Sequence, residues 1–445
     1  MTRRYFGTDG VRGTVGTPPM TVDFALRLAS AAARVLAPSG GTVLIGTDTR
    51  LSGYMFEAAL EAGFTAAGAN VLLVGPLPTP AVAFLCRRLG ADFGVVISAS
   101  HNPYDDNGIK IFAAGGEKLS DAQEAAIEAL LDEAPLTLES AALGRARRVD
   151  GARNEYQEFC KKLLPGDVDL AGVKLVVDCA HGAAYKVAPR VLADLGAEII
   201  PIGCSPNGRN INQGCGSTQP ELLATTVTGV GADMGIALDG DGDRCVLVDE
   251  LGRLVDGDQL LYVLARDAQA RDELRGPVVG TAMSNLGLEQ ALGELGIPFM
   301  RAAVGDRYVM AMLKEHGGQL GGETSGHIIN LARTSTGDGL ATALQVLAVM
   351  RHTGQRLSAL VAAMQRLPQV MINVRIAQRI ELEDTPAVQA GLRDAEAQLG
   401  ERGRVVLRAS GTEPVIRVMV EAVEASEAQL LAGRLADIVR AAARH

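Results

Sequence analysis

The sequence predicts an α/β protein with three α/β units of similar organisation and a fourth, smaller α+β unit. Three observations support this fold class. Apolar helical segments alternate with short β-branched strands through most of the 445 residues, as they do in βαβ units. A loop rich in Gly, Asp or Ser follows many of these strands. After Pro368 the strands alternate apolar and polar residues instead, which is typical of an antiparallel sheet with one exposed face.

The first unit is predicted to span residues 1–152. Its apolar periodicity places helices at residues 22–36, 53–67 and 80–89, and strands at residues 42–45, 70–74 and 93–97. Another helix is expected to begin at Ser120, because Gln123 stands at the capping-box position. The composition shifts over residues 135–149, which we interpret as an inter-domain connection.

Two further α/β units are predicted at residues 153–254 and 255–368. Strands are expected at residues 174–179, 198–202, 234–238, 246–249 and 278–280, with helices that end near Leu195, Ala270 and Leu295. The α+β unit covers residues 369–445. Its strands are expected at residues 370–376, 404–407 and 415–420, and its helices at residues 386–399 and after Ser426. Because the three α/β units share the strand-to-loop pattern, we expect similar, mixed sheets in each of them.

The composition excludes several classes of protein. Lys and Arg total 42 against 52 Asp and Glu, and the net charge of −10 comes without any basic run, so a nucleic-acid partner is not expected. The six cysteines form no C-x-x-C pair, which predicts reduced thiols in a cytoplasmic protein. The first residues contain no apolar signal segment, and apolar stretches such as residues 340–350 are too short to span a bilayer, so no membrane partner is expected.

The loop at residues 239–244 carries a carboxylate at every second position, with glycines between. The carboxylates belong to Asp239, Asp241 and Asp243. Glycine allows the backbone to fold tightly, so three oxygens can converge on one hard cation, whereas a plain acidic turn would leave the like charges to repel. A calcium EF-hand would explain Glu250 at the twelfth position, but it requires glycine where Arg244 stands and helices where strands are predicted. Mg²⁺ is therefore expected, since it binds through few carboxylates together with phosphate oxygens.

A hydroxyl beside a histidine follows the buried strand at residues 93–97. Ser100 and His101 lie in the segment Ser98-Ala99-Ser100-His101-Asn102-Pro103, with Lys110 shortly after it. Ser100 could carry a phosphate if a cation neutralised the charge, and the loop at residues 239–244 could hold that cation. A turn in which Ser and Asn side chains bond to local backbone explains this segment equally well. No G-x-S-x-G motif is present, so an esterase-type hydrolase lacks support.

Two further loops contain residue types that suit a phosphorylated sugar. Glu323 and Ser325 lie among glycines at residues 321–327, where a carboxylate and a hydroxyl suit vicinal sugar hydroxyls and a flexible turn is the alternative. Between the last two strands, Arg408 and Arg417 accompany two hydroxyls and a glycine, a set that can cradle a phosphate dianion or form a solvated hairpin. A P-loop NTPase is excluded, because no G-x-x-x-x-G-K-[ST] motif occurs.

These four loops, in this order, resemble those of the α-D-phosphohexomutase superfamily, and the likeness covers nearly the whole chain. Further segments resemble the subgroup that acts on glucosamine phosphate. They are Phe6-Gly7-Thr8-Asp9-Gly10-Val11-Arg12-Gly13, Asn210-Ile211-Asn212 and Cys215-Gly216-Ser217-Thr218. The resemblance implies four domains around a central cleft. It also implies a mutase that interconverts glucosamine 6-phosphate and glucosamine 1-phosphate through a phosphoserine and a bound 1,6-bisphosphate, and so supplies UDP-N-acetylglucosamine and cell-wall synthesis.

The resemblance also implies a role for each candidate residue. Ser100 would carry the transferable phosphate and, together with the three aspartates, hold one Mg²⁺ per chain. Arg12, His101 and Lys110 would act near the reacting group and assist acid–base chemistry. Substrate contacts are implied for a larger set. It comprises Arg244, Asp306, Arg307, Glu323, Ser325, His327, Arg408, Ser410, Gly411, Thr412 and Arg417.

The same resemblance implies Mg²⁺ as the cofactor and glucosamine or glucose 1,6-bisphosphate as an activator. A small sugar phosphate is the expected partner, and a homodimer is compatible with the sequence. Two alternatives stay open: a phosphomannomutase/phosphoglucomutase of the same superfamily, and a non-catalytic regulator that binds sugar phosphates. The regulator is opposed by Ser100 and the complete aspartate trio, because a pure binder needs neither.

Overall fold

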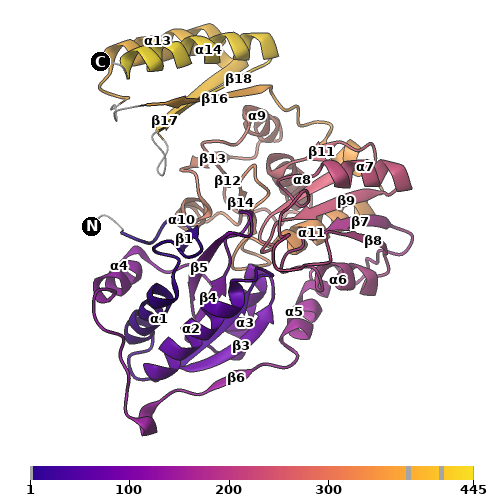
Figure 1. The fold of residues 1–445 in the computed structure, drawn as a ribbon. Coiled ribbons are helices and arrows are strands. Elements are labelled where there is room, and N and C mark those ends of the chain that lie inside the picture. Colours follow the sequence, from indigo (N-terminus) through magenta and orange to yellow (C-terminus); the bar gives the residue numbers. More distant parts are fainter. Residues whose placement is uncertain (1–3, 377–381, 410–414, 444–445) are drawn as a thin grey trace.

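The computed structural model describes residues 4–376, 382–409 and 415–443. Within these residues the strands form four sheets, and each sheet corresponds to one predicted unit. The prediction of three mixed α/β units and a C-terminal α+β unit is thereby confirmed. Figure 1 shows the fourth unit at the top of the view, set apart from the other three. The division of the chain at residues 152, 254 and 368 stays a prediction.

The first sheet has six strands in the order β1-β5-β4-β2-β3-β6. They are β1 (Val11–Thr14), β2 (Thr42–Thr47), β3 (Asn70–Pro76), β4 (Phe93–Ile97), β5 (Asp106–Ala113) and β6 (Ala146–Arg148). Strands β4, β2, β3 and β6 run parallel to one another, whereas β5 runs antiparallel to both of its neighbours, β1 and β4. Helices cover both faces of this sheet, because successive residues of β2 point to opposite faces. Ile45 packs on one face with α1 (Val22–Leu36), α2 (Gly53–Ala66) and α4 (Asp121–Leu130). Leu44 packs on the other face with α3 (Thr79–Leu89).

The segment at residues 135–149 is more than the inter-domain connection that we predicted. Its last part forms β6, which pairs in parallel with β3 and belongs to the first sheet. The prediction was wrong here because β6 has three residues, all exposed, and two of them are arginines. A short, charged edge strand lacks the apolar pattern by which a buried strand is recognised.

The second sheet has the order β11-β10-β9-β7-β8. Its strands are β7 (Lys174–Asp178), β8 (Glu198–Ile202), β9 (Met234–Leu238), β10 (Cys245–Asp249) and β11 (Leu254–Val255), and its helices are α5 (Ala152–Lys161), α6 (Ala188–Asp194) and α7 (Glu221–Val230). The sheet is parallel across β9-β7-β8 and antiparallel at β10 and β11. The tight connection between β9 and β10, residues 239–244, is called the acidic loop below.

The third sheet has the order β13-β12-β14-β15, with only β15 antiparallel among its described strands. Its strands are β12 (Val278–Thr281), β13 (Phe299–Ala302), β14 (Leu320–Gly322) and β15 (Ile328–Asn330). Its helices are α8 (Gly257–Ala270), α9 (Leu286–Glu294), α10 (Asp306–His316), α11 (Gly339–Thr353) and α12 (Leu357–Val361). One hydrophobic core continues through the first three units, since Leu44, Val177 and Leu347 belong to the same cluster.

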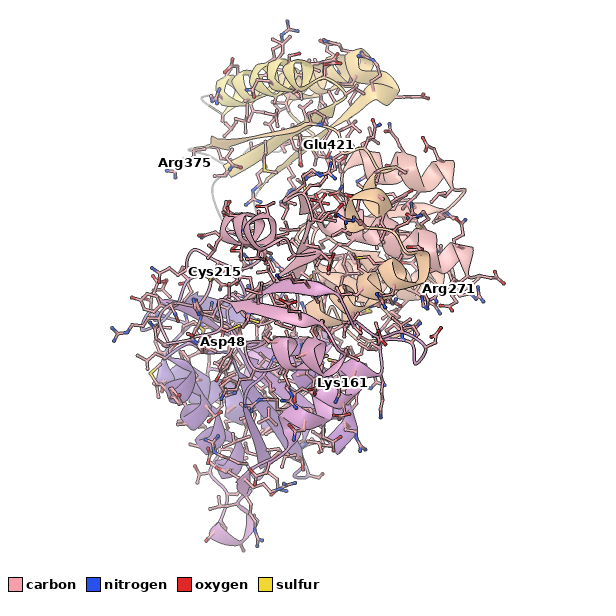
Figure 2. All side chains as sticks on the ribbon, turned by 90° about the vertical axis from the view of Figure 1, so that its right-hand side faces the viewer. Asp48, Lys161, Cys215, Arg271, Arg375 and Glu421 are labelled. Atoms are coloured by element: carbon pink, nitrogen blue, oxygen red, sulfur yellow. The ribbon has the colours of Figure 1, made fainter. Side chains whose placement is uncertain are left out.

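The fourth unit has a core of its own. Its antiparallel strands β16 (Gln369–Arg375), β18 (Val415–Ala422) and β17 (Gly403–Ala409) pack against α13 (Pro386–Leu399) and α14 (Ala425–Ala442). A polar junction joins this unit to the third: Glu421, labelled in Figure 2, is buried, lies 2.6 Å from Arg404 Nε and accepts a hydrogen bond from the backbone N–H of Leu286 at 3.0 Å. Arg404 in turn donates to the carbonyl oxygen of Ala282 at 2.9 Å.

Most predicted elements are found close to their expected bounds, and α1, β4, β8, β9 and α13 coincide with them. The capping box at α4 is also confirmed: Gln123 N–H donates to Ser120 Oγ at 3.3 Å, and Ser120 N–H donates to Gln123 Oε1 at 3.0 Å. All six cysteines are free thiols, and five of them are buried. None of the helices in the described parts of the chain has both the length and the apolar character of a membrane span.

Candidate active site

The candidate active site forms where the first three units meet. Ser100 follows β4, the acidic loop joins β9 to β10, and Glu323 and His327 belong to the turn between β14 and β15. Each of these loops leaves the carboxyl end of a sheet strand, where ligand sites of α/β proteins are usually found. Side-chain contacts between the three units then fix the geometry.

Ser100 is buried, with 1% of its surface exposed. Its Oγ donates a hydrogen bond to Asp239 Oδ2 at 2.6 Å, so the serine of the first unit touches the acidic loop of the second. The φ angle of Ser100 is 53°, in the left-handed region, which costs a non-glycine residue about 1–3 kcal/mol. Such a conformation persists only where the surrounding groups hold it.

Three side chains hold the backbone at Ser100. Ser98 Oγ accepts a hydrogen bond from Ser100 N–H at 3.0 Å. Asn212 Nδ2 donates to the carbonyl oxygens of Ser100 and Asn102, both at 2.9 Å. Arg50 Nη2 donates to the same two oxygens at 3.3 and 2.5 Å. The guanidinium of Arg50 is itself ion-paired with the buried carboxylate of Asp48. We call Asp48, Arg50 and Asn212 the serine clamp.

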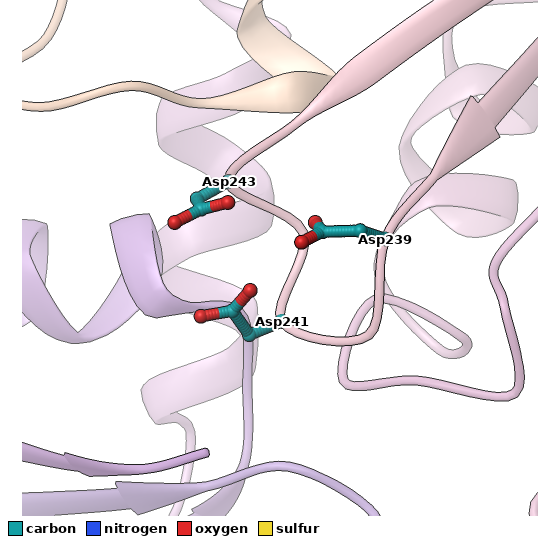
Figure 3. Close-up of side chains that lie close together, drawn as sticks. All are labelled: Asp239, Asp241 and Asp243. Atoms are coloured by element: carbon teal, nitrogen blue, oxygen red, sulfur yellow. The ribbon is translucent and has the colours of Figure 1, made fainter. Parts of the chain in front are cut away.

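The acidic loop gathers its carboxylates as the sequence predicts (Figure 3). One oxygen from each of Asp239, Asp241 and Asp243 can be chosen so that all lie within 4.8 Å of one another, and all three residues are buried. Oδ1 of Asp241 and Oδ1 of Asp243 have no hydrogen-bond partner among the residues that the structure describes. A buried carboxylate oxygen without a partner is costly, so these free oxygens fit a hard cation such as Mg²⁺.

Glycine is required at position 240 of this loop. A Cβ atom at Gly240 would lie 2.5 Å from the carbonyl oxygen of Ser100 and 2.8 Å from Asn212 Nδ2. Any larger residue would therefore push the acidic loop away from both the serine and its clamp.

Burial and repulsion alter the acidity of the carboxylates. Burial raises the pKa of Asp239, and the charges of Asp243 and Asp241 raise it further. Burial acts in the same direction on Asp243, but Lys110 and His327 outweigh it and lower the pKa of that group. The repulsion that remains around Asp239 favours a divalent cation.

Lys110 connects the acidic loop to the N-terminal segment. Its Nζ lies 2.7 Å from Asp241 Oδ2, 3.5 Å from Asp243 Oδ2 and 2.9 Å from Asp9 Oδ2. Burial opposes its charge, but these carboxylates outweigh burial and raise the pKa of Lys110. Asp9 also binds Lys118 at 2.6 Å. Lys110 is thus held as an ammonium ion, which suits charge neutralisation better than proton abstraction.

His101 is the candidate for proton transfer. Its Nδ1 lies 3.5 Å from Ser100 Oγ and 3.1 Å from Arg244 Nη1. Burial lowers the pKa of His101 to about 4, and the positive charges of Arg244 and Arg12 contribute to the shift. The imidazole is therefore neutral near pH 7 and can accept a proton. Arg12 itself is ion-paired with Asp9.

The β14–β15 turn offers polar groups from the third unit. Glu323 Oε1 accepts a hydrogen bond from the backbone N–H of Gly305 at 3.1 Å. Ser325 Oγ is buried and has no hydrogen-bond partner within the described parts of the chain, so it is available to a ligand hydroxyl. Thr324 Oγ1, between them, donates to Asp258 Oδ2 at 2.8 Å and is already engaged.

The remaining third-unit residues bridge to other units. His327 lies 3.6 Å from Asp243 and 3.5 Å from Asp306; burial opposes its charge, but these carboxylates outweigh burial and raise the pKa of His327 to about 9. Arg307 forms a two-pronged ion pair with Glu124 and also binds Asp121 at 2.8 Å. The guanidinium predicted to meet substrate is thus engaged by α4 of the first unit.

The predicted phosphate cradle lies on the fourth unit. Arg408 of β17 stands directly opposite Arg417 of β18 in the strand register. Burial lowers the pKa of Arg408, and the charge of Arg417 lowers it further. Like charges at opposed positions destabilise a sheet, so an anion near the pair would relieve the repulsion. The other predicted members, Ser410, Gly411 and Thr412, lie outside the described residues.

Comparison with known protein families agrees with this architecture. Models for the four successive domains of phosphoglucomutase/phosphomannomutase match the chain in order: alpha/beta/alpha domain I at residues 3–137, domain II at 154–252, domain III at 256–367 and the C-terminal domain at 371–438. The chain belongs to the phosphoglucomutase/phosphomannomutase family.

Curated relatives in this family match over the full length. The phosphoglucosamine mutase of Alkalilimnicola ehrlichii is 57% identical over 443 residues, covering 99% of this chain and 98% of that protein. That of Thiobacillus denitrificans is 55% identical over 451 residues, covering 100% and 98%. Among solved structures, a phosphoglucomutase/phosphomannomutase family protein of Burkholderia thailandensis superposes with a TM-score of 0.81 at 25% identity, covering 98% of this chain and 97% of its own.

Several residues that build this phosphoglucomutase/phosphomannomutase site received no role from the sequence. Asp48 and Arg50 follow β2 in a polar loop, and the position of that loop at a strand end was a usable signal. Asp9 and Asn212 lie within segments that carried the resemblance, but their contacts join distant parts of the chain. Lys118 had no signal in the sequence.

Proposed function

We propose that the protein is a phosphoglucosamine mutase, which interconverts glucosamine 6-phosphate and glucosamine 1-phosphate. One observation carries the proposal: the buried hydroxyl of Ser100 lies 2.6 Å from a carboxylate of the acidic loop, whose neighbours keep unpartnered oxygens. A nucleophile beside a cation site is the combination that phosphoryl transfer requires. The names of relatives that are 55–57% identical over the whole chain support the choice of substrate.

We assign one Mg²⁺ to Asp239, Asp241 and Asp243, with a phosphate on Ser100 completing its ligands. The unpartnered oxygens of Asp241 and Asp243 support this choice, because oxygen ligands suit that ion. When bound, Mg²⁺ would neutralise charge on the phosphoryl group during transfer. Lys110, fixed as an ammonium ion by Asp241 and Asp9, would add to that neutralisation.

In the proposed reaction, the phosphorylated Ser100 gives its phosphoryl group to the free hydroxyl of the sugar phosphate. The bond between Oγ and phosphorus breaks, a bond from phosphorus to the sugar oxygen forms, and the hydroxyl proton passes to a base. Neutral His101, 3.5 Å from Ser100 Oγ, is placed to accept it. The resulting 1,6-bisphosphate reverses its orientation in the site. Its other phosphoryl group then leaves the sugar oxygen and bonds to Ser100 Oγ, and that sugar oxygen takes up the proton.

The remaining residues would hold the sugar phosphate in either orientation. We assign Glu323 and Ser325 to the sugar hydroxyls, supported by the free hydroxyl of Ser325. We assign the phosphate that is not transferred to Arg408, Arg417 and the loop between them, supported by the opposed arginines. His327, Asp306, Arg307 and Arg244 would shape the region between these contacts.

A phosphomannomutase or phosphoglucomutase is the second candidate, because the matching domain models carry those names. The choice depends on the C2 substituent of the sugar. Measurement of kcat/KM on glucosamine, glucose and mannose phosphates tests it. We expect the highest value for glucosamine phosphate, residual activity on glucose phosphate and little on mannose phosphate, whose C2 is inverted. A higher value for either competitor would assign the protein to the second candidate.

Three further predictions belong to the same proposal. Glucosamine or glucose 1,6-bisphosphate would act as an activator by phosphorylating Ser100; a related N-acetylphosphoglucosamine mutase of Aspergillus fumigatus has been solved with glucose 1,6-bisphosphate. The cytoplasm would be the site of action. Homodimerisation remains an expectation that sedimentation of the purified protein can test.

A further inference from the structure

We propose that a cavity beside the acidic loop binds a nucleoside phosphate and thereby regulates the active site. The cavity, called the arginine pocket below, has a volume of about 340 Å³ and lies where α3, α5 and residues 333–338 meet. These elements come from the first, second and third units, so a ligand here would touch all three. None of the residues assigned above to metal or substrate lines the pocket. Binding itself is independent of the proposed function, and only the regulatory effect rests on it.

Positive charge is concentrated at this pocket. Arg87 and Arg88 stand at the end of α3, and Arg333 faces the same space. An adjoining hollow of about 360 Å³ shares Arg87 and Arg333 and adds Lys314. Two carboxylates are also present: Asp338 lines the pocket itself and accepts a hydrogen bond from the hydroxyl of Tyr156 at 2.7 Å, and Glu117 lines the adjoining hollow. The whole chain carries a net charge of −10, so such a cluster opposes the general field and favours an anion.

Most of these cations are available to a ligand. Arg87 and Lys314 form no ion pair with any residue in the described ranges. Arg333 has only a distant partner, Glu273 at 3.8 Å, and Arg88 has an exposed one, Glu155 at 3.2 Å. Exposed pairs of this kind contribute little to stability and exchange readily for a phosphate.

The other walls suit the organic part of a nucleotide. Phe84 lines the pocket and stacks on Phe159, with ring centroids 4.4 Å apart, so an aromatic surface stands beside the arginines. Ser335 and Thr334 add hydroxyl groups on the opposite element. Apolar and aromatic walls with a few placed polar groups, in a volume of roughly 300–1,000 Å³, are typical of small-molecule sites. A planar base on Phe84 with phosphates on Arg87 and Arg333 would use the aromatic and the cationic walls.

Two walls of the pocket are hydrogen-bonded to the acidic loop through the residues that adjoin them. At the start of α3, Thr79 N–H donates to the carbonyl oxygen of Asp241 at 2.8 Å, and Thr79 Oγ1 donates to the carboxylate of Asp241 at 2.5 Å. On the other side, Gly339 N–H donates to the carbonyl oxygen of Gly242 at 3.1 Å. A ligand that draws α3 and residues 333–338 together would therefore act on the acidic loop from both sides.

Calorimetric titration of the full-length, metal-free protein with ADP and with inorganic pyrophosphate tests the proposal. We compare the double variant Arg87→Ser/Arg333→Ser with the matched control Arg393→Ser/Arg434→Ser, which removes the same charge from exposed positions of the fourth unit. The pocket variant should bind ADP at least about tenfold more weakly, because it lacks two charge-assisted contacts to the phosphates. The control should bind as the native protein does.

A third variant separates the pocket from the proposed phosphate cradle. Arg417→Ser should leave ADP binding unchanged; loss of binding in this variant and not in the pocket variant would place the nucleotide in the active site and overturn the proposal. ADP should also bind more tightly than pyrophosphate, and equal affinities would overturn the assignment of the ring to Phe84.

Turnover of glucosamine phosphate without ADP should be unchanged in both double variants, and ADP should alter this turnover only where the pocket is intact. A protein that binds ADP but lacks mutase activity would refute the proposed function and still support nucleotide binding at the arginine pocket.

Discussion

The two ends of the candidate active site are built in opposite ways. At the transfer end, Ser100, Asp239 and Lys110 are each at most 2% exposed, and the units that carry them share one apolar core. At the cradle end, Arg408 and Arg417 are half-buried on strands of a unit with a separate core. A rigid, water-excluding site protects a reactive phosphoryl group from hydrolysis, whereas a separately packed unit can adjust to either end of a bisphosphate.

The attachment of the fourth unit fits this difference. Glu421 and Arg404 pair with each other within the fourth unit, and each also forms hydrogen bonds to the backbone of the third unit, at Leu286 and Ala282. Polar interfaces between units are weaker than a common core and permit relative motion. We therefore expect the chemistry to depend on the first three units and adaptable phosphate recognition on the fourth, and variants at each end test this.

The largest expected effect is at Ser100. Ser100→Ala removes the proposed phosphate carrier, and turnover should fall by about 10⁴-fold or more, as for other catalytic nucleophiles. Steady-state assays measure the loss, and mass spectrometry of the native protein should find phosphate on Ser100. Ser205→Ala is the control, since Ser205 is exposed and distant from the acidic loop in sequence. Full activity in the Ser100 variant would refute covalent transfer.

The next effect is at the acidic loop. Asp241→Asn keeps the shape of the side chain but removes one negative charge from the proposed cation site, so kcat should fall by about 10³-fold. Chelation should have the same result, and added Mg²⁺ should restore only the chelated native protein. Asp150→Asn, at an exposed position, should behave like the native protein. Undiminished turnover in metal-free buffer would show that the loop has a structural role only.

A smaller and different effect is expected at the cradle. Arg417→Ala removes a charge-assisted contact that ground state and transition state share, so KM should rise by about ten- to 150-fold while kcat changes less. Arg393→Ala, on α13 of the same unit, controls for loss of surface charge. If kcat fell as far as in Asp241→Asn with KM unchanged, the assignment of substrate binding to the cradle and of chemistry to the transfer end would be wrong.

The sequence predicted the transfer end better than the connections around it. The cation site of the acidic loop was predicted from a local pattern, its alternating carboxylates, whereas the segment at Ser100 fitted a plain turn equally well and its role was implied only by the resemblance to the superfamily. The four-unit fold was recognised because apolar periodicity is also local. By contrast, β6 was missed because a short, charged edge strand carries no such pattern.

Contacts between distant segments could not be predicted from local residue patterns. Lys110 reaches Asp241 across 131 positions, and Arg307 reaches Glu124 across 183. Such pairs depend on how whole units pack, which no spacing of residues specifies. The ion pair between Arg307 and α4 could not be predicted for the same reason, and the contact of Arg307 with substrate stays a prediction.

The last prediction tests whether the rigidity of the transfer end comes from the serine clamp. Asn212→Ala removes the hydrogen bonds to the carbonyl oxygens of Ser100 and Asn102, each worth about 0.5–1.5 kcal/mol. The left-handed conformation of Ser100 is then held by Arg50 and by the hydrogen bond from Ser100 N–H to Ser98 Oγ. If the clamp positions the serine, kcat should fall by about five- to 100-fold while KM for the sugar phosphate stays the same, because Asn212 is not assigned to substrate. Asn210→Ala is the matched control: Asn210 is two residues away, and its side chain bonds only to its own loop, at Ser205 and Asn207. A loss of kcat in the control as well, or a fall in thermal stability that parallels the loss in the Asn212 variant, would mean that the loop acts through folding. A change in KM alone would place Asn212 at the substrate instead, and the contrast between a fixed transfer end and an adaptable cradle would then need a different structural basis.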